Sequence, residues 1–326
     1  MAGNGPFQVD RVPGGNSNVT LLLSREGHRW VLRCPPPGAT TSTHDLIRET
    51  NILVALRDSD IPHARLVGVC EEPDVIGSPF AVLEWVEGIC PYASLPAAAT
   101  AADAAQLAAH VVEVLCRVHA LPPTGSLATM GRASDFCARQ PRRWLSQLDK
   151  CRTRELPDLD CALALLGQQV PAEHAGVLIH GDYGLHNLMT TAHPPLRVVA
   201  VLDWETATIG HPFLDLGHLL LFWPGSTDPT PWRRGLPEVP RGLFPPRQYV
   251  LERYVRCSGS DDVESIGWFA ALAAVRMAVI LEGTYKRVRN RPSEDPFIVG
   301  LAQTVPYLAQ LGLELIEGGW DRMDLS

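Results

Sequence analysis

Residues 178–189 read Leu-Ile-His-Gly-Asp-Tyr-Gly-Leu-His-Asn-Leu-Met, and after a short proline-containing turn residues 197–204 read Arg-Val-Val-Ala-Val-Leu-Asp-Trp. Three polar residues in this stretch are candidates for chemistry: Asp182, Asn187 and Asp203. Each aspartate follows a short apolar run, as expected where a buried strand ends in a loop. Carboxylate and carboxamide groups at strand ends can converge on one point. That combination suits Mg²⁺ together with a positioned hydroxyl group.

The order of these residues, an aspartate, four residues, an asparagine and a later aspartate, is that of kinase catalytic loops. Because His-Gly-Asp begins the loop and Leu-Asp-Trp replaces Asp-Phe-Gly, the stretch resembles the aminoglycoside phosphotransferase family, which includes choline-kinase-like and other small-molecule kinases. The continuation from Glu205 to Leu216 is similar in particular to the branch related to the kinase-like domain of acyl-CoA dehydrogenases. The resemblance extends from about Val12 to about Leu281.

This resemblance implies an α+β, bilobal protein-kinase-like fold. The N-terminal lobe would be small and β-rich with one helix, and the C-terminal lobe would be larger and mostly helical. We expect the nucleotide-binding lobe to comprise residues 1–86 and the catalytic and substrate-binding lobe residues 87–326. The hinge between them would lie at about 84–88.

Residues 7–34 are typical of a β meander with a glycine-rich turn between its first two strands. Such a turn can bring backbone N–H groups close to phosphates, so Gly15, Asn16 and Ser17 are candidate nucleotide contacts. An ordinary hairpin is the alternative. The position of the turn, ahead of Arg33 and Glu49, favours the nucleotide site.

Kinase-like folds hold the nucleotide phosphates with a cation on the third strand, paired with a helical glutamate. The chain has only two lysines, Lys150 and Lys286, and neither lies in the first lobe. The resemblance therefore assigns the cation to Arg33 and its partner to Glu49, in the helical stretch 44–57. Arginine is always charged and binds phosphate well. A surface arginine that ends a strand is the alternative.

The segment Phe-Ala-Val-Leu-Glu-Trp-Val-Glu-Gly at residues 80–88 resembles the hinge of this family. Backbone groups of Glu84 and Val86 would bond the adenine edge, with apolar side chains on either side of the ring. A plain edge strand that runs into a turn is the alternative.

Hydrophobic periodicity predicts a helix over residues 101–120, and an apolar, helix-like stretch over 213–223 contains Asp215. Asp215 fits a structural role, bracing the catalytic-loop backbone. Residues 224–246 are rich in proline, glycine and arginine and predict an irregular excursion of the kind that often covers sites. The apolar stretch 269–281 is too short for a membrane span, which favours a buried helix.

Composition is that of an ordinary globular protein, with 46% hydrophobic and 20% charged residues. The formal net charge is 28 − 36 = −8, which makes nucleic acid and anionic membranes poor partners. Eight cysteines are scattered without Cys-x-x-Cys spacing, and the N-terminus shows no secretory signal. We therefore expect free thiols and a cytoplasmic location.

In the mechanism that the resemblance implies, Asp182 orients the acceptor hydroxyl and takes its proton. Asn187 and Asp203 hold Mg²⁺ on the phosphates of ATP or GTP, which Arg33 clamps. Four histidines near this stretch could suggest zinc instead. Their spacing matches no common ligand pattern, so Mg²⁺ is favoured. The four are His174, His180, His186 and His193.

The function expected is transfer of a nucleotide γ-phosphate to a hydroxyl group of a small molecule, with an antibiotic, and hence a resistance enzyme, among the candidates. A metabolic kinase for a hydroxyacyl or amino-alcohol substrate is an alternative within the same reaction class. A non-catalytic, kinase-like nucleotide-binding module is an alternative of another class. A protein kinase is disfavoured because the Asp-Phe-Gly and Ala-Pro-Glu signals are missing.

Overall fold

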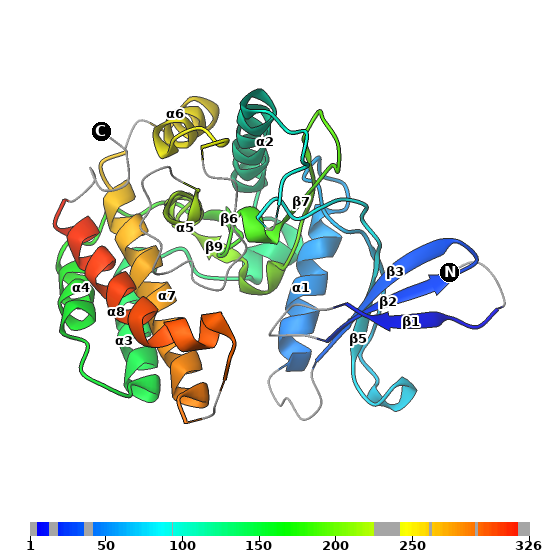
Figure 1. The fold of residues 1–326 in the computed structure, drawn as a ribbon, viewed down its shortest axis with the longest axis horizontal. Coiled ribbons are helices and arrows are strands. Elements are labelled where there is room, and N and C mark those ends of the chain that lie inside the picture. The colour runs from blue at the N-terminus through cyan, green and yellow to red at the C-terminus, as the bar shows by residue number, and fades with distance from the viewer. Residues whose placement is uncertain are drawn as a thin grey trace.

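The computed structural model describes residues 5–12, 19–35, 42–92, 94–224, 242–260, 263–290 and 293–318. The candidate phosphate-binding residues Gly15, Asn16 and Ser17 lie outside these ranges, as does most of the excursion predicted for 224–246. The described elements form a small antiparallel sheet with one helix, followed by a larger, mainly helical lobe (Figure 1). The predicted α+β, bilobal fold is confirmed, whereas the lobe boundary at residue 86 stays a prediction.

The first lobe is a five-stranded antiparallel sheet in the order β1-β2-β3-β5-β4, covered by one helix. Alternation of side chains along β5 explains this arrangement, because neighbouring residues in a strand point to opposite faces. Val82 packs with Leu23 and Trp30 in a small cluster on one face, whereas Leu83 joins the main core with Ile52 of α1. The elements are β1 (Gln8–Arg11), β2 (Val19–Arg25), β3 (His28–Cys34), α1 (Ser42–Leu56), β4 (Leu66–Cys70) and β5 (Phe80–Glu84).

The connection between the lobes is fixed directly to the segment that carries the catalytic loop. Ile89 and Thr190 exchange two backbone hydrogen bonds, of 2.9 and 2.8 Å. A Cβ atom on Gly88 would lie 2.4 Å from the carbonyl oxygen of Thr190, so only glycine allows this close approach. The hinge therefore holds the sheet at a set position over the catalytic loop.

Two short β ribbons and seven helices make up the described part of the second lobe. β6 pairs with β9 and β7 with β8, and the catalytic loop lies between β6 and β7. The strands are β6 (Val177–Ile179), β7 (Leu188–Thr190), β8 (Val198–Val201) and β9 (Thr208–Gly210). The helices are α2 (Ala101–Ala120), α3 (Phe136–Cys151), α4 (Pro157–Gln168), α5 (Phe213–Phe222), α6 (Arg247–Ser258), α7 (Ile266–Val288) and α8 (Pro296–Ile316).

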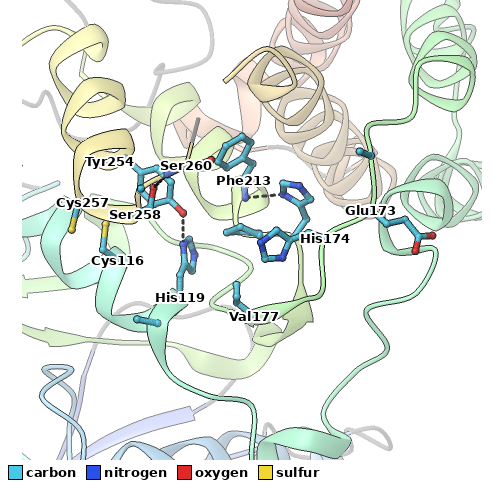
Figure 2. A pocket seen from close by; sticks show the side chains of 15 residues that line it. Cys116, His119, Glu173, His174, Val177, Phe213, Tyr254, Cys257, Ser258 and Ser260 are labelled. Carbon is cyan, nitrogen blue, oxygen red and sulfur yellow. Dashed lines mark hydrogen bonds between the residues drawn. The ribbon is translucent and has the colours of Figure 1, made fainter. Parts of the chain in front are cut away.

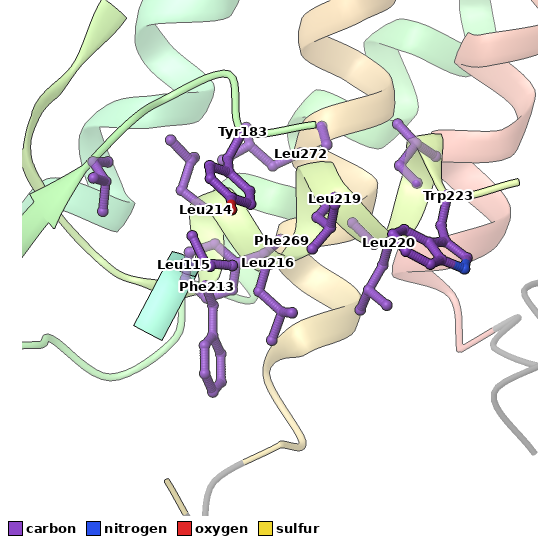
Figure 3. Close-up of a cluster of buried hydrophobic side chains, with 14 of the residues drawn as sticks. Leu115, Tyr183, Phe213, Leu214, Leu216, Leu219, Leu220, Trp223, Phe269 and Leu272 are labelled. Atoms are coloured by element: carbon purple, nitrogen blue, oxygen red, sulfur yellow. The ribbon is translucent and has the colours of Figure 1, made fainter. Parts of the chain in front are cut away.

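The core of this lobe lies around α5, which is buried along almost its whole length. Figure 3 shows Leu216 and Leu219 of α5 near Phe269 and Leu272 of α7, with Tyr183 of the catalytic loop in the same cluster. The Tyr183 hydroxyl donates a hydrogen bond of 2.8 Å to a carbonyl of α2. The catalytic loop is therefore anchored in the hydrophobic core by its own side chain.

The helix that contains residues 269–281 is longer than predicted, because α7 extends over Ile266–Val288. By length and composition it could cross a membrane, yet 72% of its most apolar window is buried inside the protein. The argument from length was therefore wrong, whereas the prediction of a buried helix is confirmed.

Candidate active site

The loop after β6 holds the side chain of Asp182 in one orientation. The Asn187 amide nitrogen donates to the backbone carbonyl of Asp182 and to its Oδ2 atom, at 2.9 Å each. The Asp182 side chain remains 29% exposed, so a substrate can reach it. Within the described residues, these bonds use the amide nitrogen of Asn187 and leave its oxygen for another ligand.

Asp215 braces the backbone of this loop, in the structural role expected for it. Its carboxylate accepts hydrogen bonds from the N–H groups of His180 and Gly181, at 2.6 and 2.7 Å. Burial alone would raise the pKa of Asp215, but hydrogen bonds and charge from His119 and His180 bring the pKa below its usual value. A buried carboxylate whose ionised form is favoured therefore lies under the loop. The His180 ring contacts the Leu202 carbonyl at 2.8 Å and so links this loop to the segment that precedes Asp203.

Asp203 lies beside the loop that carries Asp182 and Asn187. The N–H of Leu202 donates to the carbonyl of Asn187 at 2.8 Å, which places Asp203, the next residue, next to the catalytic loop. Asp203 has a φ of 64°, in the left-handed region that non-glycine residues rarely adopt. This turn directs the chain away from β8 at the residue that carries the carboxylate.

Arg33 connects the lobes at this point. One guanidinium nitrogen contacts Glu49 on α1, and the other donates to Asp203 at 3.0 Å. Burial lowers the pKa of Arg33, but Glu49 and Asp203 outweigh this effect and raise it, so the charge persists. Burial raises the pKa of Glu49 to about 7, even though Arg33 acts in the opposite direction. Arg33 is therefore a fixed cation between two carboxylates.

The structure thus brings Arg33, Glu49, Asp182, Asn187 and Asp203 into one connected group, although their roles stay predictions. At the hinge, the Glu84 N–H donates to the Arg65 carbonyl at 2.9 Å and is not available to adenine. No backbone partner is found for the N–H of Val86 in the described part of the chain.

Two histidines flank the carboxylate of Asp182: His186, which the sequence marked only as one of four histidines that could suggest zinc, and His218, which it did not mark. His218 Nε2 lies 3.1 Å from Oδ1, and His186 Nε2 lies 3.4 Å from Oδ2. His218 comes from α5, three residues after Asp215. Residues three apart share one face of a helix, so this spacing was the available signal.

The charges around Asp182 favour its ionised form. Burial by itself raises the pKa of Asp182, but His218, His186 and Arg276 together bring it below the usual range. Burial lowers the pKa of His218 to about 3, so His218 is neutral at pH 7. At that pH the positive charge beside Asp182 is that of Arg276, whose guanidinium group also donates to the Gly181 carbonyl, and His186 adds a side-chain hydrogen bond.

A basic pocket of about 640 Å³ adjoins this loop at Gly181. Five of the residues that line it are arginines, and Glu205 is its one carboxylate among the described residues. Three of these arginines donate hydrogen bonds to backbone carbonyls, which do not cancel their charge. The five arginines are Arg48, Arg132, Arg139, Arg143 and Arg276.

A second cavity, of about 480 Å³, lies between α2, α6 and the start of α5 (Figure 2). His119 and Tyr254 meet in it at 2.7 Å, and His119 Nε2 lies 3.3 Å from Asp215. His119 is therefore a buried structural histidine that lines this cavity and contacts Asp215, which braces the catalytic loop.

The site and fold define a class, the kinase-like phosphotransferases, and comparisons with known proteins agree. The family model of the "Phosphotransferase enzyme family" matches residues 8–238. Mouse acyl-CoA dehydrogenase family member 11 is 34% identical over 322 residues, which cover 94% of this chain and 40% of that protein. The chain thus spans less than half the length of this relative. It belongs to the phosphotransferase enzyme family.

Solved structures agree with this assignment. A Ralstonia eutropha protein described as an aminoglycoside phosphotransferase has a TM-score of 0.82 and 28% identity, with 96% of this chain and 93% of that chain covered. The GDP and kanamycin complex of an aminoglycoside 2″-phosphotransferase has a TM-score of 0.65 and 16% identity, with 92% of each chain covered. At that identity the second likeness concerns the fold alone.

Proposed function

We propose that this protein transfers the γ-phosphate of ATP or GTP to a hydroxyl group of a small molecule. The observation that carries the proposal is the connected group of Arg33, Glu49, Asp182, Asn187 and Asp203, which joins both lobes. Asp182 orients the hydroxyl and accepts its proton, because its carboxylate is ionised, accessible and held in place. Base catalysis of this kind supplies roughly 10²- to 10⁴-fold in rate.

Asn187 and Asp203 would hold Mg²⁺. The donor set fits a hard cation, because the Asn187 oxygen has no partner in the described part of the chain and Asp203 uses one carboxylate oxygen for Arg33. When bound, Mg²⁺ neutralises charge on the nucleotide phosphates. Arg33 lies beside Asp203 and supplies a second positive charge to the same phosphates.

The backbone carbonyl of Glu84 and the N–H of Val86 would bind the adenine or guanine edge at a hinge spanning about 84–88. Because the Glu84 N–H already bonds the Arg65 carbonyl in the sheet, only the carbonyl of Glu84 would contact the base. The GDP complex of a structural relative supports a nucleotide in this fold without choosing between ATP and GTP.

The charge of the basic pocket indicates which class of acceptor it would bind. Arg132 is paired with Asp135 at 3.5 Å, and the remaining excess of arginine over the one glutamate favours an acceptor that carries carboxylate or phosphate groups. A polycationic aminoglycoside would meet repulsion there, so among antibiotics an uncharged or anionic one fits better. Of the metabolic substrates that the sequence left open, hydroxyacyl and amino-alcohol compounds, a hydroxyacyl compound that carries an acidic group fits the pocket best. The eight free cysteines are consistent with a reducing, cytoplasmic setting.

The test is a panel of acceptors graded by charge, incubated with Mg²⁺ and γ-labelled ATP or GTP. The panel pairs anionic hydroxyacyl thioesters with cationic aminoglycosides, and includes macrolides and nucleosides as acceptors of low charge. We expect label on an anionic compound and none on aminoglycosides. Efficient labelling of an aminoglycoside would contradict the acceptor class. Nucleotide binding without transfer to any compound would favour the non-catalytic binding module.

A further inference from the structure

A second cluster of ligand-type atoms surrounds the carboxylate of Asp182. One atom each of Asp182, His186 and His218 lies within 4.8 Å of the other two. Two imidazoles and one carboxylate that face a common point are a donor set typical of zinc and related divalent ions. The sequence could not reveal this set, because His218 lies on α5, far along the chain from the other two.

The distances agree with a tetrahedral metal site. Zinc bonds to nitrogen and oxygen of about 2.0–2.1 Å place neighbouring ligand atoms about 3.3 Å apart. His186 Nε2 lies 3.4 Å from Asp182 Oδ2, and His218 Nε2 lies 3.1 Å from Asp182 Oδ1. The two distances end on different oxygens of the carboxylate, so Asp182 would turn one oxygen toward both histidines when it binds an ion.

His218 independently indicates a missing ligand. Its side chain is only 2% exposed, and within the described residues Nδ1 has no hydrogen-bond partner, whereas Nε2 lies 3.1 Å from Asp182 Oδ1 without the alignment of a hydrogen bond. A buried polar group without a partner costs free energy, and such groups usually have a functional reason.

Neighbouring side chains cover the cluster of Asp182, His186 and His218 on the side of His218, and Asp182 and His186 are partly exposed to solvent. Asn187 donates to Asp182 Oδ2 at 2.9 Å, which orients the carboxylate as outer hydrogen bonds do around metals. Phe222 lies 4.6 Å from the His218 ring and covers its apolar side. The side chains of Asp182 and His186 are 29% and 31% exposed, so an ion can enter and keep a water molecule as its fourth ligand.

We propose that Asp182, His186 and His218 bind a zinc-class divalent cation, distinct from the Mg²⁺ at Asn187 and Asp203. Two imidazoles favour Zn²⁺, Co²⁺ or Ni²⁺ over Mg²⁺, which prefers oxygen ligands. The bound ion occupies the carboxylate that accepts the proton of the hydroxyl. If the proposed phosphotransfer is correct, Zn²⁺ is therefore an inhibitor that acts on the base.

The test uses the full chain and Co²⁺ as a spectroscopic probe, titrated in excess Mg²⁺. We expect the intense visible bands of four-coordinate Co²⁺, lost when Zn²⁺ is added. His186→Gln and Asp182→Asn should each weaken binding at least tenfold. His193→Gln changes an exposed histidine outside the cluster and should leave the affinity unchanged. Circular dichroism confirms that each variant is folded.

Absence of the four-coordinate spectrum would overturn the proposal, as would equal affinity in the wild type and in both ligand variants. This readout does not depend on activity, so failure of the metal site and failure of the phosphotransferase assignment are distinguishable. Where transfer is measured, half-inhibition by Zn²⁺ should occur at the concentration that half-fills the site. Inhibition unrelated to occupancy would contradict the action on Asp182.

Discussion

At the scale of single residues, burial and neighbouring charges determine the pKa values of the carboxyl groups in this site. Glu49 is 3% exposed, and among the described residues it has one cationic partner, Arg33, which also bonds Asp203. One shared cation does not fully compensate for taking a carboxylate out of water. The pKa of Glu49 is therefore raised to about 7, whereas Asp215, with two backbone donors and His119, has a lowered pKa.

The raised pKa makes Glu49 a source of pH-dependent stability. The folded protein binds a proton at Glu49 more tightly than the unfolded chain, so this contribution is full below about pH 4.5 and is lost as the pH rises through about 7. The change amounts to about 3 kcal/mol at most. We predict that Glu49→Gln flattens the free energy of unfolding between pH 5 and 8 relative to wild type.

Chemical denaturation at several pH values measures this effect. Glu84→Gln, at an exposed position on the same sheet, is the control and should keep the wild-type profile. A Glu49→Gln profile parallel to wild type would show that Glu49 is ionised throughout.

Among the elements, α2 begins with a complete capping box. The Thr100 hydroxyl accepts from the N–H of Asp103, and the Asp103 carboxylate accepts from the N–H of Thr100. Such a cap satisfies two backbone donors that the helix leaves open. We predict that Thr100→Ala lowers the free energy of unfolding by about 1 kcal/mol. Thr124, which precedes a short helical turn without a side-chain cap bond, is the control and should tolerate alanine within about 0.5 kcal/mol.

The crossing of α5 and α7 depends on a helical glycine. A Cβ atom on Gly217 would lie 2.7 Å from the backbone carbonyl carbon of Phe269. Since α5 carries Asp215 and His218, any displacement also moves the brace of the catalytic loop. We predict that Gly217→Ala costs about 1–3 kcal/mol of stability, because neither backbone can yield locally.

A glycine in another helix provides the matched comparison. Gly167 of α4 has no neighbour within 4 Å of a built Cβ, so Gly167→Ala should be neutral or stabilising by about 0.5 kcal/mol. Thermal unfolding of both variants tests the pair. Equal midpoints for the two would contradict the close approach of α5 and α7.

At the scale of the whole molecule, the local sequence motif identified more of the site residues than the hydrophobic pattern of the helices did. Asp182, Asn187 and Asp203 lie in a motif of fixed spacing, and Arg33 and Glu49 follow from the place of that motif in the fold. His218 and Arg276 reach Asp182 from α5 and α7, whose crossing depends on side-chain packing across the whole lobe. Periodicity finds such helices without showing which neighbours they face.

The sequence did not reveal the basic pocket either, because the pocket depends on which helices pack together. Arg139 and Arg143 lie on α3, but the pocket forms only where α3 meets α7 and the catalytic loop. The net charge of −8 did not indicate a basic pocket, because it sums the charges of the whole chain. Local charge at a site is a property of the folded chain.

The central claim is that Asp182 acts as the base in phosphoryl transfer, and one comparison tests it most directly. Turnover of wild type and Asp182→Asn should be measured with the acceptor that takes the label, alongside the nucleotide dissociation constant. We predict a fall in kcat of roughly 10²- to 10⁴-fold with nucleotide affinity unchanged, since Asp182 acts on the hydroxyl and not on the nucleotide. A kcat within about threefold of wild type would contradict the account.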